Sequence, residues 1–393
     1  MIDAPINDRP LRLLVNDRPL LGVRTGVGRY LEQLLAAWPS DAGDRIRMLC
    51  TRVPSVPRPT NVELDALTPL QIEPLSKLRP RPENEAIGSV RRAALRWGYD
   101  LWAGAGVRVR GRRAGVYFEP NHIPVAPTGR VVATIHDLSI IDVPQFHPPD
   151  RVRAWERRFR CRLAWVDRFI CVSHATAGRL RDNCGVERSR IEVIHPGPTW
   201  TQSPKGWTPH ACRQRLGLPE RYIVCLGTLE PRKNHRVLLD AIRTGSGGEV
   251  PTLLLLGPIG WGDERFWSSL VHHPAAPRVL YAGRVSDGQA LAALIGSCGL
   301  VYPSHYEGFG LPPLEAMSLG RRVVVSSAPS LLEVVGEAGQ VVDPSDADGW
   351  ARAMHSLGDR DAQAEAKASR RAQQFSWRTA ARLHRQTFQR VGA

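Results

Sequence analysis

The sequence lacks long apolar segments. Short apolar runs such as Leu13–Val15, Leu253–Leu256 and Val323–Val325 fall far below the roughly 20 residues that cross a bilayer. The N-terminal segment MIDAPINDRPLRLLV carries acids and prolines around no long apolar core, so we expect no secretory signal. These absences argue against a membrane-spanning protein.

The sequence also lacks paired cysteines. Its seven cysteines are odd in number, scattered and without a Cys-x-x-Cys pair: Cys50, Cys161, Cys171, Cys184, Cys212, Cys225 and Cys298. That pattern suits neither a disulfide framework nor a zinc site, and it is typical of reduced thiols in the cytoplasm. We therefore expect a cytoplasmic protein.

Acidic residues are few beside basic ones. The 53 lysines and arginines exceed the 38 aspartates and glutamates, giving a formal charge of +15. Nucleic acid, an anionic membrane and a phosphorylated substrate are all compatible partners, and the sign of the charge alone does not choose among them. With 42% apolar and 23% charged residues the composition is that of a globular protein, and the length of 393 residues predicts two domains.

Short β-branched apolar segments alternate with helical patterns along almost the whole chain. Segments that we predict as strands begin at residues 11, 45, 114, 130, 168 and 190, and then at 221, 252, 278, 299 and 321. Strands separated in this way by helices are typical of parallel sheets covered on both faces. The segment 196–209 is rich in proline, threonine and serine, and we predict that it links two such halves.

Two glutamates stand eight positions apart in HYEGFGLPPLEAMSLG, His305–Gly320. Glu307 lies in a glycine-containing loop, and Glu315 is expected in the first turn of a helix that begins near Pro312. A helix N-terminus attracts anions, whereas carboxylates repel phosphate and accept hydrogen bonds from sugar hydroxyls. The pair therefore suggests that Glu315 binds a ribose and Glu307 a hexose. The alternative is that Glu315 complements the helix dipole and Glu307 caps a turn.

This stretch resembles the Glu-x7-Glu motif of retaining glycosyltransferases with the GT-B fold, in particular glycosyltransferase family 4. The resemblance extends over nearly the whole chain, through the motifs TGVGRY (Thr25–Tyr30), IHDLS (Ile135–Ser139), VSHATAGRL (Val172–Leu180) and GTLEPRKNH (Gly227–His235). It implies an α/β fold of two doubly wound Rossmann-like domains that face each other across a cleft. We expect an acceptor-side domain over 1–197, a nucleotide-sugar-binding domain over 210–375, and a C-terminal helix over 376–393 that could pack back on the first domain.

The resemblance implies a role for each matching residue. Glu307 would lie beside the transferred sugar, Glu315 on the nucleotide ribose and Lys233 on the donor diphosphate. Many relatives have an arginine where this chain has Thr228, so Arg232 is expected to supply the missing charge. Further donor contacts are expected from His136 to the sugar, from Gly26 and Gly28 to the β-phosphate, from Arg284 and Val285 to the base, and from Gly308, Phe309, Gly310 and Leu311 to the sugar. Glu307, His136 and Lys233 form the expected catalytic set.

An acidic triplet resembles a metal motif. Asp346–Asp348 imitates the Asp-x-Asp motif of the other main glycosyltransferase fold, but DPSDADGWARAM is typical of the acidic first turn of a helix. The family resemblance implies basic residues and helix ends at the diphosphate in place of a divalent cation. We therefore expect neither a metal nor a cofactor.

The expected activity is transfer of a hexose with retention of the anomeric configuration. The series of motifs most resembles bacterial mannosyltransferases of polysaccharide and O-antigen assembly. GDP-mannose is therefore the first choice of donor, and a hydroxyl of a glycan or lipid-linked acceptor receives the sugar. The alternatives are a transferase that uses a UDP-sugar, a sugar-nucleotide epimerase and a nucleic-acid-binding protein. The basic residues of this chain lack the interleaved aromatic residues of a platform for single-stranded nucleic acid, so we expect no nucleic acid partner.

Basic residues concentrate in one part of the first domain. Between Lys77 and Arg113 there are ten basic residues and three acidic ones. Within RRAALRWGYDLWAGAGVRV, residues 91–109, the side chains of Leu95, Trp97, Tyr99, Leu101 and Trp102 lie close to arginines, as in an interfacial helix. We expect this domain to bind the anionic inner face of the plasma membrane, where a polyprenyl-linked acceptor would lie. The alternative is a solvated face with a few core aromatic residues.

Overall fold

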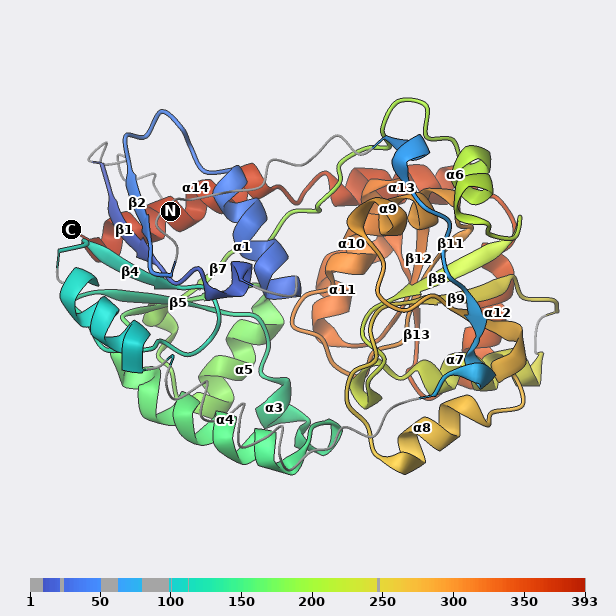
Figure 1. The fold of residues 1–393 in the computed structure, drawn as a ribbon, viewed down its shortest axis with the longest axis horizontal. Helices are drawn as coiled ribbons and strands as arrows, with labels where there is room; N and C mark the ends of the chain where they lie inside the picture. The colour runs from blue at the N-terminus through green and yellow to red at the C-terminus, as the bar shows by residue number, and fades with distance from the viewer. Residues whose placement is uncertain are drawn as a thin grey trace.

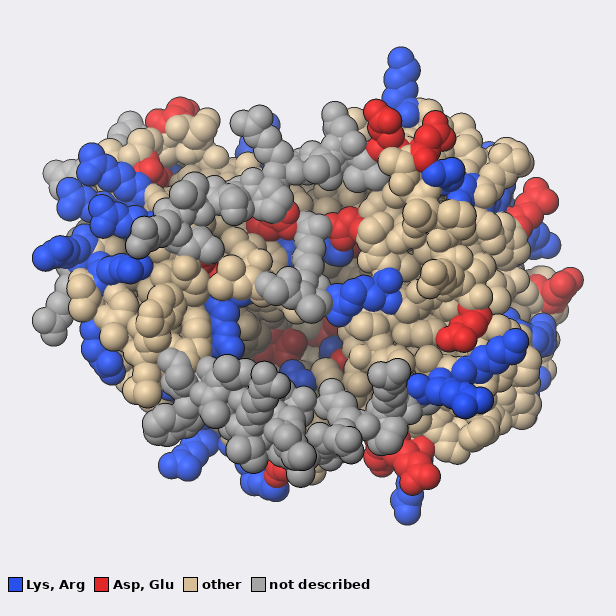
Figure 2. All heavy atoms as spheres, in the orientation of Figure 1, with Lys and Arg blue, Asp and Glu red and all other residues tan. Residues whose placement is uncertain are grey.

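A computed structural model describes residues 10–21, 25–50, 63–79, 99, 101–111, 113–245 and 248–392. These residues form two α/β domains that lie side by side, the first on the left of Figure 1 and the second on the right. In Figure 2 the surface is hollowed between the domains, and acidic and basic side chains lie within the hollow. The two facing domains that the sequence predicts are confirmed.

The sheet of the first domain is parallel, in the order β2-β1-β4-β5-β6-β7. Its strands are β1 Arg12–Val15, β2 Arg45–Met48, β4 Val116–Glu119, β5 Val131–Ile135, β6 Arg168–Cys171 and β7 Ile191–Val193. Every residue of β4 and β5 is buried, because helices cover both faces of the sheet. One face packs on α1 (Gly26–Ala36) and the other on α4 (Pro149–Arg162) and α5 (His174–Cys184).

The sheet of the second domain has the order β13-β12-β11-β8-β9-β10-β3. Its strands are β8 Tyr222–Leu226, β9 Thr252–Leu256, β10 Val279–Tyr281, β11 Gly299–Tyr302, β12 Arg322–Ser326, β13 Gln340–Val342 and β3 Glu73–Pro74. All pairings are parallel except that of β3 with β10. Each segment that the sequence predicts as a strand contains one, whereas β13 and β3 were not predicted.

The placement of β3 corrects the expected domain boundary. Residues 1–197 were assigned to the first domain, but Glu73–Pro74 pairs with β10, and Leu75 and Leu78 are buried in the core of the second domain. Figure 1 shows this part of the chain, drawn in blue, lying along the right-hand domain. A free edge strand offers unpaired N–H and C=O groups, and a short segment from a distant part of the chain covers them here.

The remaining helices lie between the strands or, for α12, α13 and α14, follow the last strand. They are α3 Ser139–Asp142, α6 Pro209–Leu216, α7 His235–Thr244, α8 Glu264–Val271, α9 Asp287–Gly296, α10 Leu311–Ser318, α11 Pro329–Val335, α12 Ala347–Leu357, α13 Ala362–Ala372 and α14 Trp377–Gly392. A further helix covers 101–111. In the parts of the chain that the structure describes, no helix is both long and apolar enough to cross a membrane.

The last helix, α14, returns across the molecule to the first domain, where Figure 1 draws it in red. The hydroxyl of Tyr30 on α1 lies 2.7 Å from Nε2 of His384, and Nε of Arg385 donates to Asp44 at 2.8 Å. The side chain of Arg385 is 10% exposed and that of Asp44 is 2% exposed. Because breaking a buried ion pair leaves a charge uncompensated, this contact fastens the end of the chain to the first domain.

Candidate active site

The expected donor residues lie where the strand order of the second sheet reverses. Strands β8 and β11 are neighbours at the centre of that sheet although they are distant in sequence. The loop after β8 carries GTLEPRKN and the loop after β11 carries HYEGFG. A backbone hydrogen bond of 2.9 Å from the amide of His305 to the carbonyl of Arg232 joins the two loops. Ligands of open α/β sheets bind at such a position.

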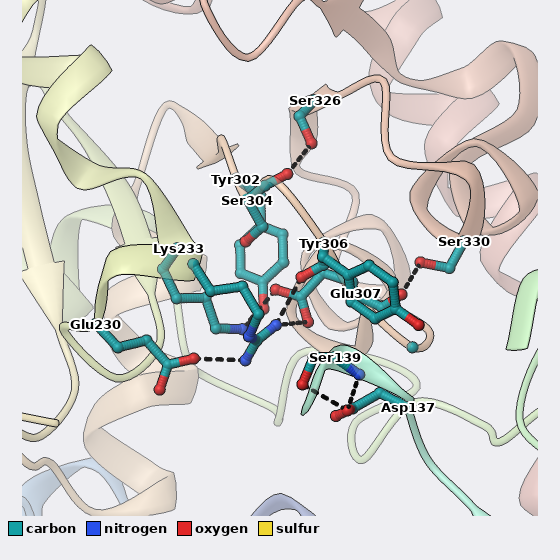
Figure 3. Close-up of polar contacts among 12 residues, drawn as sticks. Asp137, Ser139, Glu230, Lys233, Tyr302, Ser304, Tyr306, Glu307, Ser326 and Ser330 are labelled. Carbon is teal, nitrogen blue, oxygen red and sulfur yellow. Dashed lines mark hydrogen bonds and ion pairs between the residues drawn. The ribbon is translucent and has the colours of Figure 1, made fainter. Parts of the chain in front are cut away.

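Glu307 forms ion pairs with two cations of the β8 loop (Figure 3). Its Oε1 lies 2.6 Å from Nζ of Lys233, and its Oε2 lies 3.3 Å from Nη1 of Arg232. Lys233 also donates to the hydroxyl of Tyr302 at 2.7 Å, and Arg232 donates to Glu230 at 2.6 Å. The three side chains of the Glu307 cluster are each 10–12% exposed. The structure therefore brings together Glu307, Lys233 and Arg232 as predicted.

The protonation of these groups follows from their burial and their partners. Burial by itself would raise the pKa of Glu307, but Lys233 and Arg232 outweigh it and hold that pKa below its ordinary value. Burial also raises the pKa of Glu230, against the opposing effect of Arg232. Glu307 is thus a carboxylate at neutral pH, as stabilisation of a cationic sugar ring would require.

Glu315 lies on α10 and contacts both the linker and the first domain. Its Oε1 accepts from the hydroxyl of Thr199 at 2.6 Å and lies 3.6 Å from Nη1 of Arg29. Arg29 also donates from Nη2 to Asp287, the first residue of α9, at 2.7 Å. The side chain of Glu315 is fully buried, and its Oε2 has no hydrogen-bond partner among the described residues.

The position of Glu315 in the helix differs from the prediction. The sequence placed Glu315 in the first turn, but α10 begins at Leu311 after Gly310, so Glu315 is its fifth residue. Its side chain is buried against Thr199 and Arg29. Pro312 and Pro313 lack an N–H, which reduces the donors that this helix end offers to an anion.

The glycine loop packs directly on the first domain. A Cβ added at Gly308 would lie 1.7 Å from the carbonyl oxygen of His136, so only glycine fits there. The carbonyl of Gly308 accepts from the hydroxyls of Ser173 at 2.6 Å and Thr176 at 3.1 Å. The ring of Phe309 is buried at 5% exposure and stacks near His195. The loop is thus held between the domains, with Leu311 starting the helix behind it.

His136 lies at the end of β5 beside this loop. Its Nε2 is 2.7 Å from the carbonyl of Pro120, so the hydrogen on that nitrogen donates to the carbonyl. Burial, followed by the neighbouring His122, lowers the pKa of His136 to about 3. The ring is therefore neutral near pH 7, and its expected contact with the donor sugar stays a prediction. Asp137 accepts from the amide and hydroxyl of Ser139 and so shapes this loop.

The remaining residues predicted to contact the donor lie at the start of α1 and after β10. Thr25 caps α1 by accepting from the amide of Gly28 at 3.2 Å, and a Cβ on Gly28 would lie 2.5 Å from the carbonyl oxygen of Pro19. A Cβ on Gly26 would meet no atom within 4 Å, so the backbone is open there. After β10, Arg284 is exposed and Val285 is half-buried. Their roles toward the phosphate and the base stay predictions.

Two groups of side chains have metal-binding chemistry. Asp346 accepts from the amide of Gly349 at 2.8 Å and caps α12, which is the helix-start role predicted for the Asp346–Asp348 triplet. Elsewhere His174, His195 and Glu333 place ligand atoms within 4.8 Å of one another. The carboxylate of Glu333 already accepts from the amide of His174 at 2.9 Å and from Nε2 of His195 at 2.6 Å. These contacts join α11 of the second domain to α5 of the first.

The comparisons with known proteins agree with this geometry. Residues 24–198 match the family model described as Glycosyltransferase Family 4, and residues 220–360 match that of Glycosyl transferases group 1. The O-antigen chain mannosyltransferase B of Escherichia coli is 35% identical over 271 residues, which cover 67% of this chain and 71% of that protein. The chain belongs to glycosyltransferase family 4.

More distant relatives support the same assignment. The D-inositol 3-phosphate glycosyltransferase of Salinispora arenicola is 30% identical over 65% of this chain and 61% of its own length. Anabaena HepE in complex with UDP and glucose has a TM-score of 0.65 at 15% identity, over 96% of this chain and 99% of its own. WaaG, a glycosyltransferase involved in lipopolysaccharide biosynthesis, has a TM-score of 0.65 at 12% identity, over 96% and 99%. This family 4 protein is therefore a glycosyltransferase with the GT-B fold.

Sequence reasoning missed three groups that contact predicted site residues: Arg29 and Thr199 at Glu315, and the hydroxyl of Tyr302 at Lys233. Arg29 lies in the motif TGVGRY, in which only Gly26 and Gly28 were predicted to contact the donor. Its partners Asp287 and Glu315 lie more than 250 residues further along the chain. No local pattern in the sequence connects them.

We predict that replacing either of the two glutamates impairs this glycosyltransferase, one through donor binding and the other through turnover. Glu315→Ala weakens donor binding by about 1.5–3 kcal/mol, the range for a hydrogen bond to a charged group. Glu307→Ala chiefly lowers kcat, because its charge counts most when the sugar ring becomes cationic. Steady-state kinetics over a range of donor concentrations separate the two effects.

The control for this prediction concerns folding. Removing Glu307 leaves Lys233 and Arg232 buried without their shared carboxylate, which is itself destabilising. Glu307→Gln keeps the shape, so it is measured alongside, and both variants are checked by thermal melting. A folded Glu307→Gln enzyme with full turnover would show that the assigned role is wrong.

Proposed function

We propose that this family 4 enzyme transfers mannose from GDP-mannose to a hydroxyl of a cell-surface glycan or its lipid-linked precursor, with retention of configuration. The observation that carries the proposal is the buried Glu307 between Lys233 and Arg232 at the switch point of the second sheet. The choice of mannose and of polysaccharide synthesis is supported by the 35% identity to an O-antigen chain mannosyltransferase.

The site offers a cation to the leaving diphosphate. An ammonium group has three N–H donors, and Lys233 uses two of them on Glu307 and Tyr302 among the described residues. A phosphate oxygen can accept the third. As the bond from sugar C1 to the phosphate oxygen breaks, its electron pair passes to the diphosphate, and Lys233 and Arg232 stabilise the charge that develops.

Glu307 is proposed to stabilise the positive charge that develops on the sugar ring. When the C1–O bond breaks, the ring carries positive charge, and a carboxylate held ionised by two cations can stabilise it. In a same-face route the acceptor oxygen bonds to C1 from the side that the diphosphate leaves, and a phosphate oxygen takes the acceptor proton. Retention of configuration then requires no second carboxylate. Neutral His136 donates to Pro120 and does not add a further charge.

A UDP-sugar is the second candidate donor. Anabaena HepE, which shares the fold, has been solved with UDP and glucose. The base is expected beside Arg284 and Val285, where backbone groups would contact it, and side-chain identity does not specify guanine or uracil there. GDP-mannose takes precedence because the mannosyltransferase is a much closer relative in sequence than HepE.

We predict that GDP-mannose raises the melting temperature and supports transfer. The wild-type protein is melted with GDP-mannose, GDP-glucose, UDP-glucose and ADP-glucose at equal concentrations, since a ligand that binds the folded state stabilises it. Transfer to a simple mannoside acceptor is then followed with the donor that stabilises most, and the anomeric configuration of the product is read by NMR. Stabilisation by a UDP-sugar alone would select the second candidate, and an inverted product would overturn the retaining assignment.

Turnover is expected to survive removal of divalent cations. Lys233, Arg232 and the loop amides supply the positive groups at the diphosphate, and Asp346 is engaged as a helix cap. The rate is measured after EDTA treatment and again after magnesium or manganese is restored. Loss of activity that the added metal reverses would contradict this prediction.

We further propose that the first domain binds an anionic membrane through the helix at 101–111. Leu101, Trp102 and Val109 are 65%, 55% and 66% exposed, and Arg108 and Arg110 are exposed beside them. Trp102, Val109 and Arg110 help to line an apolar depression of about 300 Å³. Apolar side chains mixed with arginines are typical of interfacial helices.

The structure corrects two details of that expected surface. Lys77 ends the short helix η3 (Leu75–Lys77), which packs on the second domain, so it does not belong to the face of the first. Tyr99 points inward and donates to Asn16 at 2.7 Å. Trp97 and most of the preceding basic residues lie outside the described residues. The proposed surface therefore rests on the helix at 101–111.

We predict that the protein floats with liposomes of anionic lipid at low salt and much less at roughly 0.5 M salt, where the Debye length falls to about 4 Å. Each basic side chain near an anionic leaflet contributes about 1 kcal/mol. Leu101→Ser combined with Trp102→Ser should reduce binding, whereas Arg153→Gln, on the exposed face of α4, serves as the control. Binding that ignores lipid charge and salt, or no binding, would overturn this proposal without touching the donor chemistry.

A further inference from the structure

Arg29 reaches from the first domain to two carboxylates of the second. It lies on α1, and its guanidinium donates to Asp287 at 2.7 Å and stands 3.6 Å from Oε1 of Glu315. Asp287 is the first residue of α9 and Glu315 lies in the middle of α10, so one side chain contacts two helices across the domain boundary. Arg29 itself is 22% exposed.

We propose that Arg29 is a positioning residue for the donor, which keeps Glu315 charged and aimed at the nucleotide ribose when the two domains are together. The inference rests on the proposed function, in which Glu315 accepts from the ribose hydroxyls. It adds a further residue of the first domain to the donor site.

Two buried atoms support the proposal. Oε2 of Glu315 and Nε of Arg29 are both buried and have no hydrogen-bond partner among the described residues. A buried polar atom without a partner is unfavourable, and native proteins seldom leave one without a reason. A ribose hydroxyl that donates to Oε2 would satisfy the carboxylate, while Thr199 and Arg29 hold its other oxygen.

The charge state of Glu315 depends on its neighbours. Burial raises the pKa of Glu315, Arg29 and the hydroxyl of Thr199 lower it, and Asp287 raises it. Arg29 is the cation that lowers the pKa of this carboxyl group, and Asp287 is the acidic group that opposes it. Without Arg29 the balance shifts toward the protonated form.

Loss of Arg29 is expected to change how nucleotide affinity depends on pH. Removing the positive charge of Arg29 raises the pKa of Glu315 further, so the carboxylate becomes neutral at a higher pH than in the wild type. A neutral carboxyl group accepts a weaker hydrogen bond from a ribose hydroxyl than a carboxylate does. The loss of affinity is therefore greatest between the wild-type pKa and the raised pKa of Glu315, and it diminishes as the pH rises through the raised one.

The test measures the affinity of GDP and of UDP by calorimetry between pH 6 and pH 9, together with donor KM and kcat. For the nucleotide that binds, Arg29→Gln is expected to weaken affinity about tenfold near pH 6, the size of one charged hydrogen bond, and by less near pH 9. Donor KM rises in parallel, and kcat changes little. Arg29→Lys keeps the charge and should recover part of the affinity at low pH.

Glu315→Gln provides the decisive comparison. It should weaken nucleotide binding at every pH, and the variant that combines Arg29→Gln with Glu315→Gln should bind no more weakly than Glu315→Gln alone, because Arg29 acts through Glu315. Losses that add in the combined variant, or a loss in Arg29→Gln that is constant across the pH range, would overturn the inference.

The same set of variants separates this inference from the proposed function. If Glu315→Gln binds both nucleotides as the wild type does, the assigned ribose contact is wrong and the inference falls with it. If Glu315→Gln loses affinity and Arg29→Gln does not, the inference alone is overturned.

Arg160→Gln, which removes an exposed arginine paired with Glu156 on α4, is the matched control for loss of one charge. Should Arg29→Gln fail to fold, Thr199→Val removes another donor to Glu315 and is expected to show the same dependence on pH.

Discussion

The site depends on one buried carboxylate that two cations of another loop hold in place. Glu307 is 10% exposed, and an unpaired charge at that depth would strongly destabilise the fold. Its contacts with Lys233 and Arg232 therefore fix the loop after β11 against the loop after β8, and Glu230 on the far side of Arg232 completes the chain of charges. The geometry that would serve sugar transfer is thus also the geometry that makes burial of these charges tolerable.

The second constraint is the close approach of the two domains beside that carboxylate. Gly308, the residue after Glu307, meets the backbone of His136 where no side chain would fit, and Ser173 and Thr176 donate to its carbonyl. On the other side Glu333 caps the start of α5 across the same boundary. A shift of either domain would change the donor loop directly, so the relative position of the domains and the shape of the site cannot vary independently.

Much of this could be predicted from the sequence, because periodicity and motif spacing are local. The apolar segments around 130–135 and 252–256 predicted buried parallel strands. Lys233 and Glu307 were predicted to meet because each lies in a loop that follows such a strand. What the sequence could not show depends on contacts between distant segments. Glu73–Pro74 is too short to have a period of its own, and it becomes a strand because β10 has a free edge. The partners of Glu315, Thr199 and Arg29, lie more than 100 residues away in the sequence, so its burial against them could not be predicted.

The distribution of charge gives a final constraint on partners. At the described site three cations, Arg29, Arg232 and Lys233, face five carboxylates, Asp137, Glu230, Asp287, Glu307 and Glu315. The donor site therefore does not account for the formal charge of +15, and the excess must lie elsewhere on the protein. Figure 2 shows lysine and arginine side chains gathered on the outer end of the first domain, away from the hollow. An anionic partner on the outside of the molecule would account for this charge better than the donor would, because the three cations of the described donor site are each already paired with a carboxylate.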